Sequence, residues 1–198
     1  MLGFNLSGRT VGIVGTGKIG LAVSKIMRGF DCRVIAFDPK RSSAFEALDG
    51  IYVDMSELLA SSDIISLHCP WMPMTHHLIG NREIDQMKPG VMLVNTSRGA
   101  VVDTKALIAG LKSGKIGYVG LDVYEEEADF FFENSSDQVI QDDVFARLLT
   151  FPNVLITGHQ AFFTHEAMTA IAETTIGNIS SFEKTAIPLY PLSSEKPA

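Results

Sequence analysis

The chain has 198 residues, which is room for one domain with an appendage or for two small domains. Apolar residues make up 46% and charged residues 20%, as in ordinary globular proteins, so extensive disorder is excluded. A formal net charge of −7 offers no general attraction to nucleic acids or anionic membranes, and no apolar run reaches the roughly 20 residues that span a bilayer. We therefore expect neither a nucleic-acid partner nor a membrane partner.

The two cysteines, Cys32 and Cys69, are too few for a disulfide framework or a metal cluster. His68, His76 and His77 lie close together in the sequence, but no cysteine or carboxylate stands at metal-ligand spacing beside them. The N-terminal segment lacks a basic region followed by an apolar one, so it is not typical of a secretory signal. We therefore expect structural histidines, no metal, and a reducing, cytoplasmic environment.

Short apolar segments follow one another along the chain and predict β-strands. They cover residues 10–14, 33–37, 51–53, 63–68, 91–95, 118–123 and 154–157. These segments are continuous apolar runs rather than alternating ones, which is typical of parallel strands covered on both faces.

Helical spacing and capping residues predict helices between the strands. The first helix follows the glycines of residues 15–20. The caps predicted for the later helices are Ser43, Asp54, Asn81, Asp103, Asp142 or Asp143, and Thr164. Gly114 is expected to end the helix that Asp103 begins. Strands that alternate with helices predict an α/β fold. The expected architecture is a Rossmann-type doubly wound parallel sheet of about six or seven strands, in three α/β/α layers.

Gly15, Gly17 and Gly20 form a Gly-x-Gly-x-x-Gly motif between the first predicted strand and the first predicted helix. In that context the glycines allow a tight turn, a close approach of backbone to a pyrophosphate, and close packing of helix on strand. The helix N-terminus then offers N–H groups and a positive dipole end to the phosphates. A glycine-rich turn without a ligand is the alternative, and the strand–turn–helix context favours a dinucleotide site.

Asp38 follows the second predicted strand, where a carboxylate can accept hydrogen bonds from the adenosine ribose and repel a 2′-phosphate. This position predicts NAD rather than NADP as the cofactor. Lys40 and Arg41 count against that preference, because basic groups nearby could meet a 2′-phosphate. A simple Asp-Pro turn is the structural alternative for Asp38.

Three ionisable residues follow strands at the edge where ligands bind in such sheets: Arg98, Glu127 and His159. Each alone has a plain interpretation, as a surface charge, as one of an acidic trio, and as a loop residue. Together they form a set suited to acid–base chemistry and carboxylate binding.

Several motifs, in this order along the chain, resemble the NAD-binding domain of the D-isomer-specific 2-hydroxyacid dehydrogenases. They are residues 11–20, residues 68–70 with Thr75, residues 94–99, residues 121–127 and residues 157–162. The resemblance covers about residues 3–186. Residues 131–133, 139–143 and 159–164 are most similar to the D-lactate dehydrogenase branch of the family.

The resemblance implies a role for each matched residue. Arg98 would bind the carboxylate of a 2-oxo acid and polarise its ketone, and His159 would be the general acid. Glu127 would hydrogen-bond His159 and keep its pKa above the usual ~6.5. The remaining cofactor positions are Lys18 and Ile19 at the pyrophosphate, Asp122 on the nicotinamide side, and Cys69, Pro70, Thr75, Thr96 and Ser97 along the cleft. Ala128 departs from the proline of many relatives.

Cys69 has a second interpretation as a reactive thiol. Cysteines at strand ends are more often small packed residues, and no base can be identified beside this one, so the lining role is favoured.

Family members have two domains, with the active site in the cleft between them. The expected boundaries are residues 1–186 for the NAD-binding domain and 187–198 for a tail that is either disordered or a remnant of the substrate domain. The N-terminal part of the substrate domain is expected to be absent, through isolation of the domain, natural truncation or a mis-assigned start. A homodimer is also expected, since relatives usually dimerise through this domain and residues 130–132 could supply apolar surface.

The resemblance implies an NAD-dependent oxidoreductase that reduces pyruvate to D-lactate and that is inactive as this chain alone. Two alternatives stay open. One is a related dehydrogenase for another 2-oxo acid, and the other is a non-enzymatic NAD-sensing protein, because the family includes transcriptional corepressors.

Overall fold

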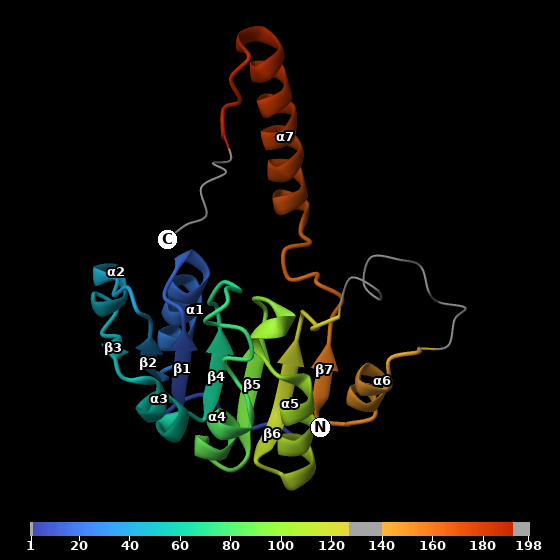
Figure 1. Cartoon of the computed structure of the whole chain (residues 1–198). Helices are drawn as coiled ribbons and strands as arrows, with labels where there is room; N and C mark the ends of the chain where they lie inside the picture. The colour runs from blue at the N-terminus through green and yellow to red at the C-terminus, as the bar shows by residue number, and fades with distance from the viewer. Residues whose placement is uncertain (1, 127–139, 192–198) are drawn as a thin grey trace. The chain divides into compact units, whose positions relative to one another are not determined.

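The computed structural model describes residues 2–126 and 140–191 (Figure 1). In chain order its elements are β1 (Thr10–Val14), α1 (Lys18–Gly29), β2 (Arg33–Phe37), α2 (Ser43–Glu46), β3 (Ile51–Tyr52), α3 (Met55–Ser61), β4 (Ile64–Leu67), α4 (Asn81–Gln86), β5 (Val91–Asn95), a 3-10 turn (Gly99–Val101), α5 (Thr104–Ser113), β6 (Ile116–Leu121), α6 (Asp143–Leu149), β7 (Val154–Ile156) and α7 (His165–Thr185). They fall into two compact units, residues 1–159 with the sheet and residues 160–198 with α7.

The seven strands form one sheet in the order β3-β2-β1-β4-β5-β6-β7, and every pairing is parallel. The predicted doubly wound α/β fold is therefore confirmed, with the upper of the two expected strand numbers. The register aligns the carboxyl ends of neighbouring strands, because Val14 pairs with Leu67, Leu67 with Asn95, Asn95 with Leu121, and Leu121 with Ile156. Loops that follow these strands consequently emerge at one edge of the sheet.

Two apolar clusters, one on each face of the sheet, form the core. The larger contains Leu58 and Leu59 of α3, Ile84 of α4 and Leu107 of α5. The smaller contains Phe45 of α2, with side chains of α1 packed against it. Burial on both faces explains why the strands are continuous apolar runs.

Capping residues begin several helices where the sequence predicts them. Asp54 accepts a hydrogen bond from the Glu57 N–H at 2.7 Å, and Asp103, Asp142 and Thr164 cap α5, α6 and α7 in the same way. Gly114 ends α5 with a φ of 75°, as its predicted role as a stop requires.

Two predicted caps and one strand are displaced. The N-cap of α2 is Ser42 rather than Ser43, without a side-chain cap, and that of α4 is Gly80 rather than Asn81. Glu83 accepts the Gly80 N–H at 3.1 Å, so the acidic residue of the first turn satisfies this helix end. The sixth strand begins at Ile116 and ends at Leu121, because Ile116 pairs with Val91.

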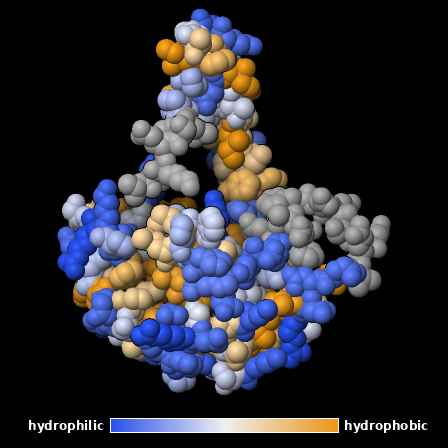
Figure 2. All heavy atoms as spheres, in the orientation of Figure 1, coloured by the Kyte–Doolittle hydropathy of each residue, from blue (hydrophilic) through white to orange (hydrophobic). Residues whose placement is uncertain are grey.

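The second unit contains α7, which has no buried residue. Its exposed apolar side chains include Met168, Ile171, Ile176, Ile179 and Phe182, and Figure 2 shows hydrophobic atoms along this helix. No helix in the parts of the chain described above is long and apolar enough to cross a membrane. The predicted boundary after residue 186 and the tail to residue 198 remain predictions.

Candidate active site

The glycine motif forms the turn between β1 and α1. Gly15 has a φ of +95°, and a Cβ there would lie 2.9 Å from the backbone N of Cys69. A Cβ on Gly20 would lie 2.0 Å from the Gly15 carbonyl oxygen. A Cβ on Gly17, by contrast, meets no atom within 4 Å, so the space above the start of α1 is open. This arrangement fits a pyrophosphate on the helix N-terminus, where Lys18 is the first helical residue.

Asp38 lies at the end of β2 and is tied to the glycine turn. Its Oδ2 accepts the Thr16 N–H at 2.6 Å and the Thr16 hydroxyl at 3.0 Å, and its Oδ1 accepts the Lys40 N–H at 2.8 Å. A carboxylate has about four acceptor positions, so these three bonds leave capacity for a ribose hydroxyl.

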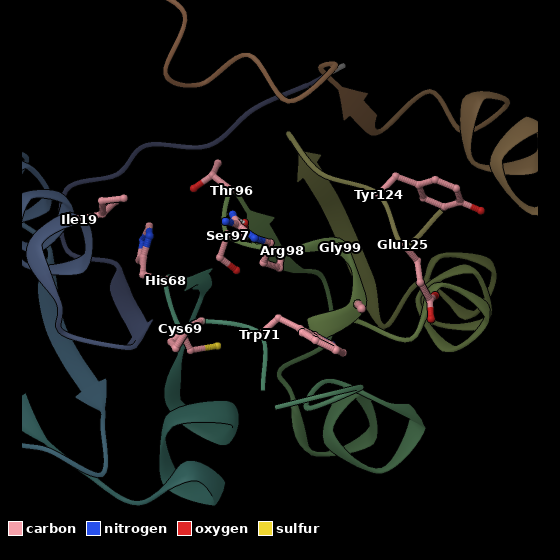
Figure 3. A pocket seen from close by; sticks show the side chains of 12 residues that line it. Ile19, His68, Cys69, Trp71, Thr96, Ser97, Arg98, Gly99, Tyr124 and Glu125 are labelled. Atoms are coloured by element: carbon pink, nitrogen blue, oxygen red, sulfur yellow. Dashed lines mark hydrogen bonds between the residues drawn. The ribbon is translucent and has the colours of Figure 1, made fainter. Parts of the chain in front are cut away.

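A cavity of about 570 Å³ opens at the same edge of the sheet (Figure 3). Its lining residues are Ile19, His68, Cys69, Pro70, Trp71, Thr96, Ser97, Arg98, Gly99, Ala100, Tyr124 and Glu125. They come from the start of α1 and from the segments that follow β4, β5 and β6. The cavity thus gathers six of the predicted site residues on the loops where an α/β sheet binds its ligands.

Other predicted site residues lie outside this lining. The phosphate turn and the ribose position are formed by Gly15, Gly17, Lys18, Gly20 and Asp38. Asp122 follows β6, and His159 follows β7.

Thr75 holds the loop after β4 together. Its hydroxyl donates to the Pro70 carbonyl oxygen at 2.7 Å and accepts the Met72 N–H at 2.8 Å. Glu127 and the predicted aromatic segment 130–132 lie outside the described residues.

Arg98 is presented by a turn that Asn95 organises. The Asn95 Oδ1 accepts the Ser97 N–H at 3.0 Å and hydroxyl at 2.8 Å, while its amide donates to the Arg98 carbonyl oxygen at 2.9 Å. Next to it a Cβ on Gly99 would lie 2.1 Å from the Tyr124 carbonyl oxygen, so only glycine fits between the two loops. The exposed Arg98 guanidinium donates to the Ser97 carbonyl oxygen at 2.7 Å and has further N–H groups for a carboxylate.

Asp122 is a buried anchor between the loops that follow β6 and β7. Its Oδ1 accepts the Thr157 hydroxyl at 2.5 Å, and its carbonyl oxygen accepts the His159 N–H at 2.7 Å. His159 has a φ of 52°, in the left-handed region that residues other than glycine adopt uncommonly. These contacts fix the backbone of His159 beside that of Asp122.

Burial controls the protonation of two groups in the cavity lining. It lowers the pKa of His68 to about 4, so this imidazole is neutral, and its Nε2 lies 2.9 Å from the Ser66 hydroxyl. Burial also raises the pKa of the Cys69 thiol. A protonated thiol is a poor nucleophile, which favours the lining role of Cys69 over the reactive one.

Sequence reasoning missed Trp71, Tyr124 and Glu125 as lining residues. Glu125 pairs with His77 through its Oε1 and accepts the Thr104 hydroxyl at 3.1 Å through its Oε2. The pair joins the loop after β6 to the loop after β4, a structural role of the kind expected for His77. Tyr124 and Glu125 could have been found from the sequence, because they directly follow a predicted strand and such positions lie at the edge of the sheet where ligands bind.

The family model for the D-isomer specific 2-hydroxyacid dehydrogenase NAD binding domain matches residues 1–161. The chain belongs to this family. It is 54% identical over 184 residues to the D-lactate dehydrogenase of Escherichia coli strain K12, covering 93% of this chain and 56% of that protein. The family predicted from the motifs is therefore confirmed, and so are its NAD-binding domain and its D-lactate dehydrogenase relatives.

Solved structures agree with this assignment. The pyruvate reductase of Chlamydomonas reinhardtii superposes with a TM-score of 0.92 at 44% identity, covering 96% of this chain and 58% of that one. The D-lactate dehydrogenase of Lactobacillus jensenii with NAD+ superposes with a TM-score of 0.88 at 30% identity, covering 97% of this chain and 58% of that one. As a 2-hydroxyacid dehydrogenase NAD-binding domain, the chain spans little more than half the length of these relatives.

Proposed function

We propose that the chain is the cofactor-binding and catalytic-residue-bearing part of a D-lactate dehydrogenase that reduces pyruvate to D-lactate with NADH. The observation that carries this proposal is the position of Arg98 in a cavity that also contains Ile19 of the phosphate-binding helix. A planar guanidinium suits the carboxylate of a 2-oxo acid, and its position places that acid beside the cofactor site. The identity to D-lactate dehydrogenases supports the choice of substrate.

The residues present fit NAD. Open space at Gly17 and the N-terminus of α1 accommodate a pyrophosphate, and Asp38 accepts from the adenosine ribose. The reduced nicotinamide supplies the hydride when it is bound. The lining residues Ile19, Cys69, Pro70, Thr96 and Ser97 hold the cofactor along the cavity.

Arg98 binds the carboxylate of the substrate and polarises its ketone. His159 donates a proton to the ketone oxygen as the carbonyl carbon is reduced, and it accepts that proton in the reverse reaction. Asp122 orients the His159 backbone through the bond at 2.7 Å. Glu127 is proposed as the carboxylate partner of the imidazole, on the strength of the family motif. Domain boundaries at residue 186, a homodimer and a cytoplasmic location belong to the same proposal.

A chimera tests the substrate. The chain is joined to the part of the Escherichia coli D-lactate dehydrogenase that it does not match, and NADH oxidation is followed with a panel of 2-oxo acids. Pyruvate is expected to be the best substrate, and His159→Gln is expected to lower kcat by about 10²- to 10⁴-fold. A chimera that binds NADH but reduces no 2-oxo acid would favour a non-enzymatic NAD-sensing role. Activity that His159→Gln leaves unchanged would contradict the proposed acid.

A further inference from the structure

Tyr52, the last residue of the edge strand β3, is linked to the ribose carboxylate by a directed chain of hydroxyl groups. Its hydroxyl lies 2.7 Å from the Thr16 hydroxyl and accepts the Ser42 N–H at 2.8 Å. Thr16 has one hydroxyl proton, which it donates to the Asp38 Oδ2 at 3.0 Å. Tyr52 must therefore be the donor to Thr16, and the chain runs from Tyr52 through Thr16 to Asp38.

This chain fixes the carboxylate from one side. The Thr16 N–H also donates to the Asp38 Oδ2, at 2.6 Å, while the Lys40 N–H holds the Oδ1. A hydroxyl that accepts from Tyr52 is a stronger donor to Asp38, since linked hydrogen bonds polarise one another. Asp38 is consequently held in one orientation before a ribose arrives.

The ring of Tyr52 makes a second contact, with the basic side chain of Arg41, three residues after Asp38. The Arg41 guanidinium lies 5.4 Å from the centroid of the Tyr52 ring, within cation–π distance. The Tyr52 ring also packs against Phe45 of the core. Phe45 is fully buried, and the centroids of the two rings lie 4.8 Å apart. Tyr52 thus provides a fixed aromatic surface that holds Arg41.

We propose that Tyr52 is a positioning residue for the preference of NAD(H) over NADP(H). Its hydroxyl holds Asp38 toward the ribose hydroxyls, and its ring retains Arg41, a cation that could otherwise stabilise a 2′-phosphate. The inference rests on the proposed cofactor site and deepens it. It also accounts for the presence of Arg41 beside the carboxylate proposed to select NAD.

The full 198-residue chain is titrated with NADH and with NADPH, and the nicotinamide fluorescence gives both dissociation constants. Tyr52→Phe removes the hydroxyl but keeps the ring, so the NADH constant should rise about 3- to 10-fold, as for one lost hydrogen bond. Tyr52→Leu also frees Arg41, so the preference for NADH over NADPH should fall by about tenfold or more. The matched control is Tyr118→Phe on β6, whose hydroxyl donates to the Leu2 carbonyl oxygen in the N-terminal segment, and it should change neither constant.

Double variants separate positioning from a general loss of structure. In a Thr16→Val background, Tyr52→Phe should not change the NADH dissociation constant further, because the hydrogen bonds that link Tyr52 to Asp38 are already broken. Freeing Arg41 in Tyr52→Leu should strengthen NADPH binding, and adding Arg41→Gln to that variant should reverse this gain. Equal losses for NADH and NADPH with an unchanged preference, or additive effects of Tyr52→Phe and Thr16→Val, would overturn the inference. If the folded wild-type chain binds neither dinucleotide, the proposed function itself fails.

Discussion

The backbone N–H of His159 donates to the carbonyl oxygen of Asp122 at 2.7 Å. This bond holds the backbone of His159, the proposed general acid, beside the residue that directly follows β6. Thr157 reinforces this link through its hydroxyl, 2.5 Å from the Asp122 Oδ1. Two loops from different strands therefore share one buried carboxylate, which is 4% exposed as a residue. The position of His159 depends on this anchor rather than on its own loop alone.

Thr157→Val should destabilise the chain by about 1 to 2 kcal/mol, because the buried Asp122 carboxylate loses a hydroxyl donor. The free energy of unfolding from urea titration measures the effect. Thr175→Val is the matched control, since the exposed Thr175 hydroxyl donates to the Ile171 carbonyl oxygen within α7. Equal losses in both variants would argue against the anchor.

The glycine turn predicts opposite outcomes for two similar substitutions. Gly20→Ala should destabilise the chain by several kcal/mol, because its Cβ would lie 2.0 Å from the Gly15 carbonyl oxygen. Gly17→Ala should leave the melting temperature within a few degrees of wild type, because its Cβ meets no atom within 4 Å. A Gly17→Ala variant that melts like Gly20→Ala would contradict the open space.

Asp63 contributes stability that depends on pH. Burial acts to raise its pKa, but hydrogen bonds from Thr10 and Lys88 and the charges of Lys88 and Arg9 outweigh it and bring the pKa below 3.8. The carboxylate therefore stabilises the fold above about pH 4, and this contribution is lost as the pH falls through the lowered pKa. Asp63→Asn should cost about 1 to 2 kcal/mol at pH 7 and progressively less below pH 4. Asp85→Asn, at an exposed position of α4, is the matched control for the loss of one carboxylate.

His68 predicts a pH dependence in a different range. Burial lowers its pKa from 6.5 to about 4, so the unfolded chain takes up a proton in this interval and the folded chain does not. Stability should fall as the pH drops from 6.5 to 4, by up to about 3 kcal/mol, and level off below that. The difference between wild type and His68→Gln, measured by urea unfolding across this range, isolates the effect. A constant difference would show that the pKa of His68 is the same in the folded and unfolded chains, and would contradict its lowering by burial.

Much of the fold follows from local signals in the sequence. The strands Thr10–Val14, Arg33–Phe37 and Val91–Asn95 lie where continuous apolar runs predict them, because burial on both faces leaves no other pattern. Asp54 and Asp103 cap as predicted, since a carboxylate before a helix has few better partners than its free N–H groups. The start of β6 at Ile116 was missed because Gly117 interrupts its apolar run, and pairing with β5 decides that boundary.

The site was predicted less completely. Arg98 and the glycine turn could be identified because motif and strand end coincide. The Glu125–His77 pair and the chain from Tyr52 to Asp38 join residues far apart in the sequence, so no local pattern shows them. The contact of Arg41 with the Tyr52 ring likewise depends on the pairing of β2 with β3.

The central claim is that this chain binds NADH on the N-terminus of α1, and a fluorescence titration of the isolated chain tests it most directly. Saturable binding at one site per chain is expected for wild type. Gly17→Ala should weaken binding by at least about tenfold at an unchanged melting temperature, because its Cβ enters the space of the pyrophosphate. A folded wild-type chain without saturable NADH binding, or a Gly17→Ala variant that binds as wild type does, would contradict the account.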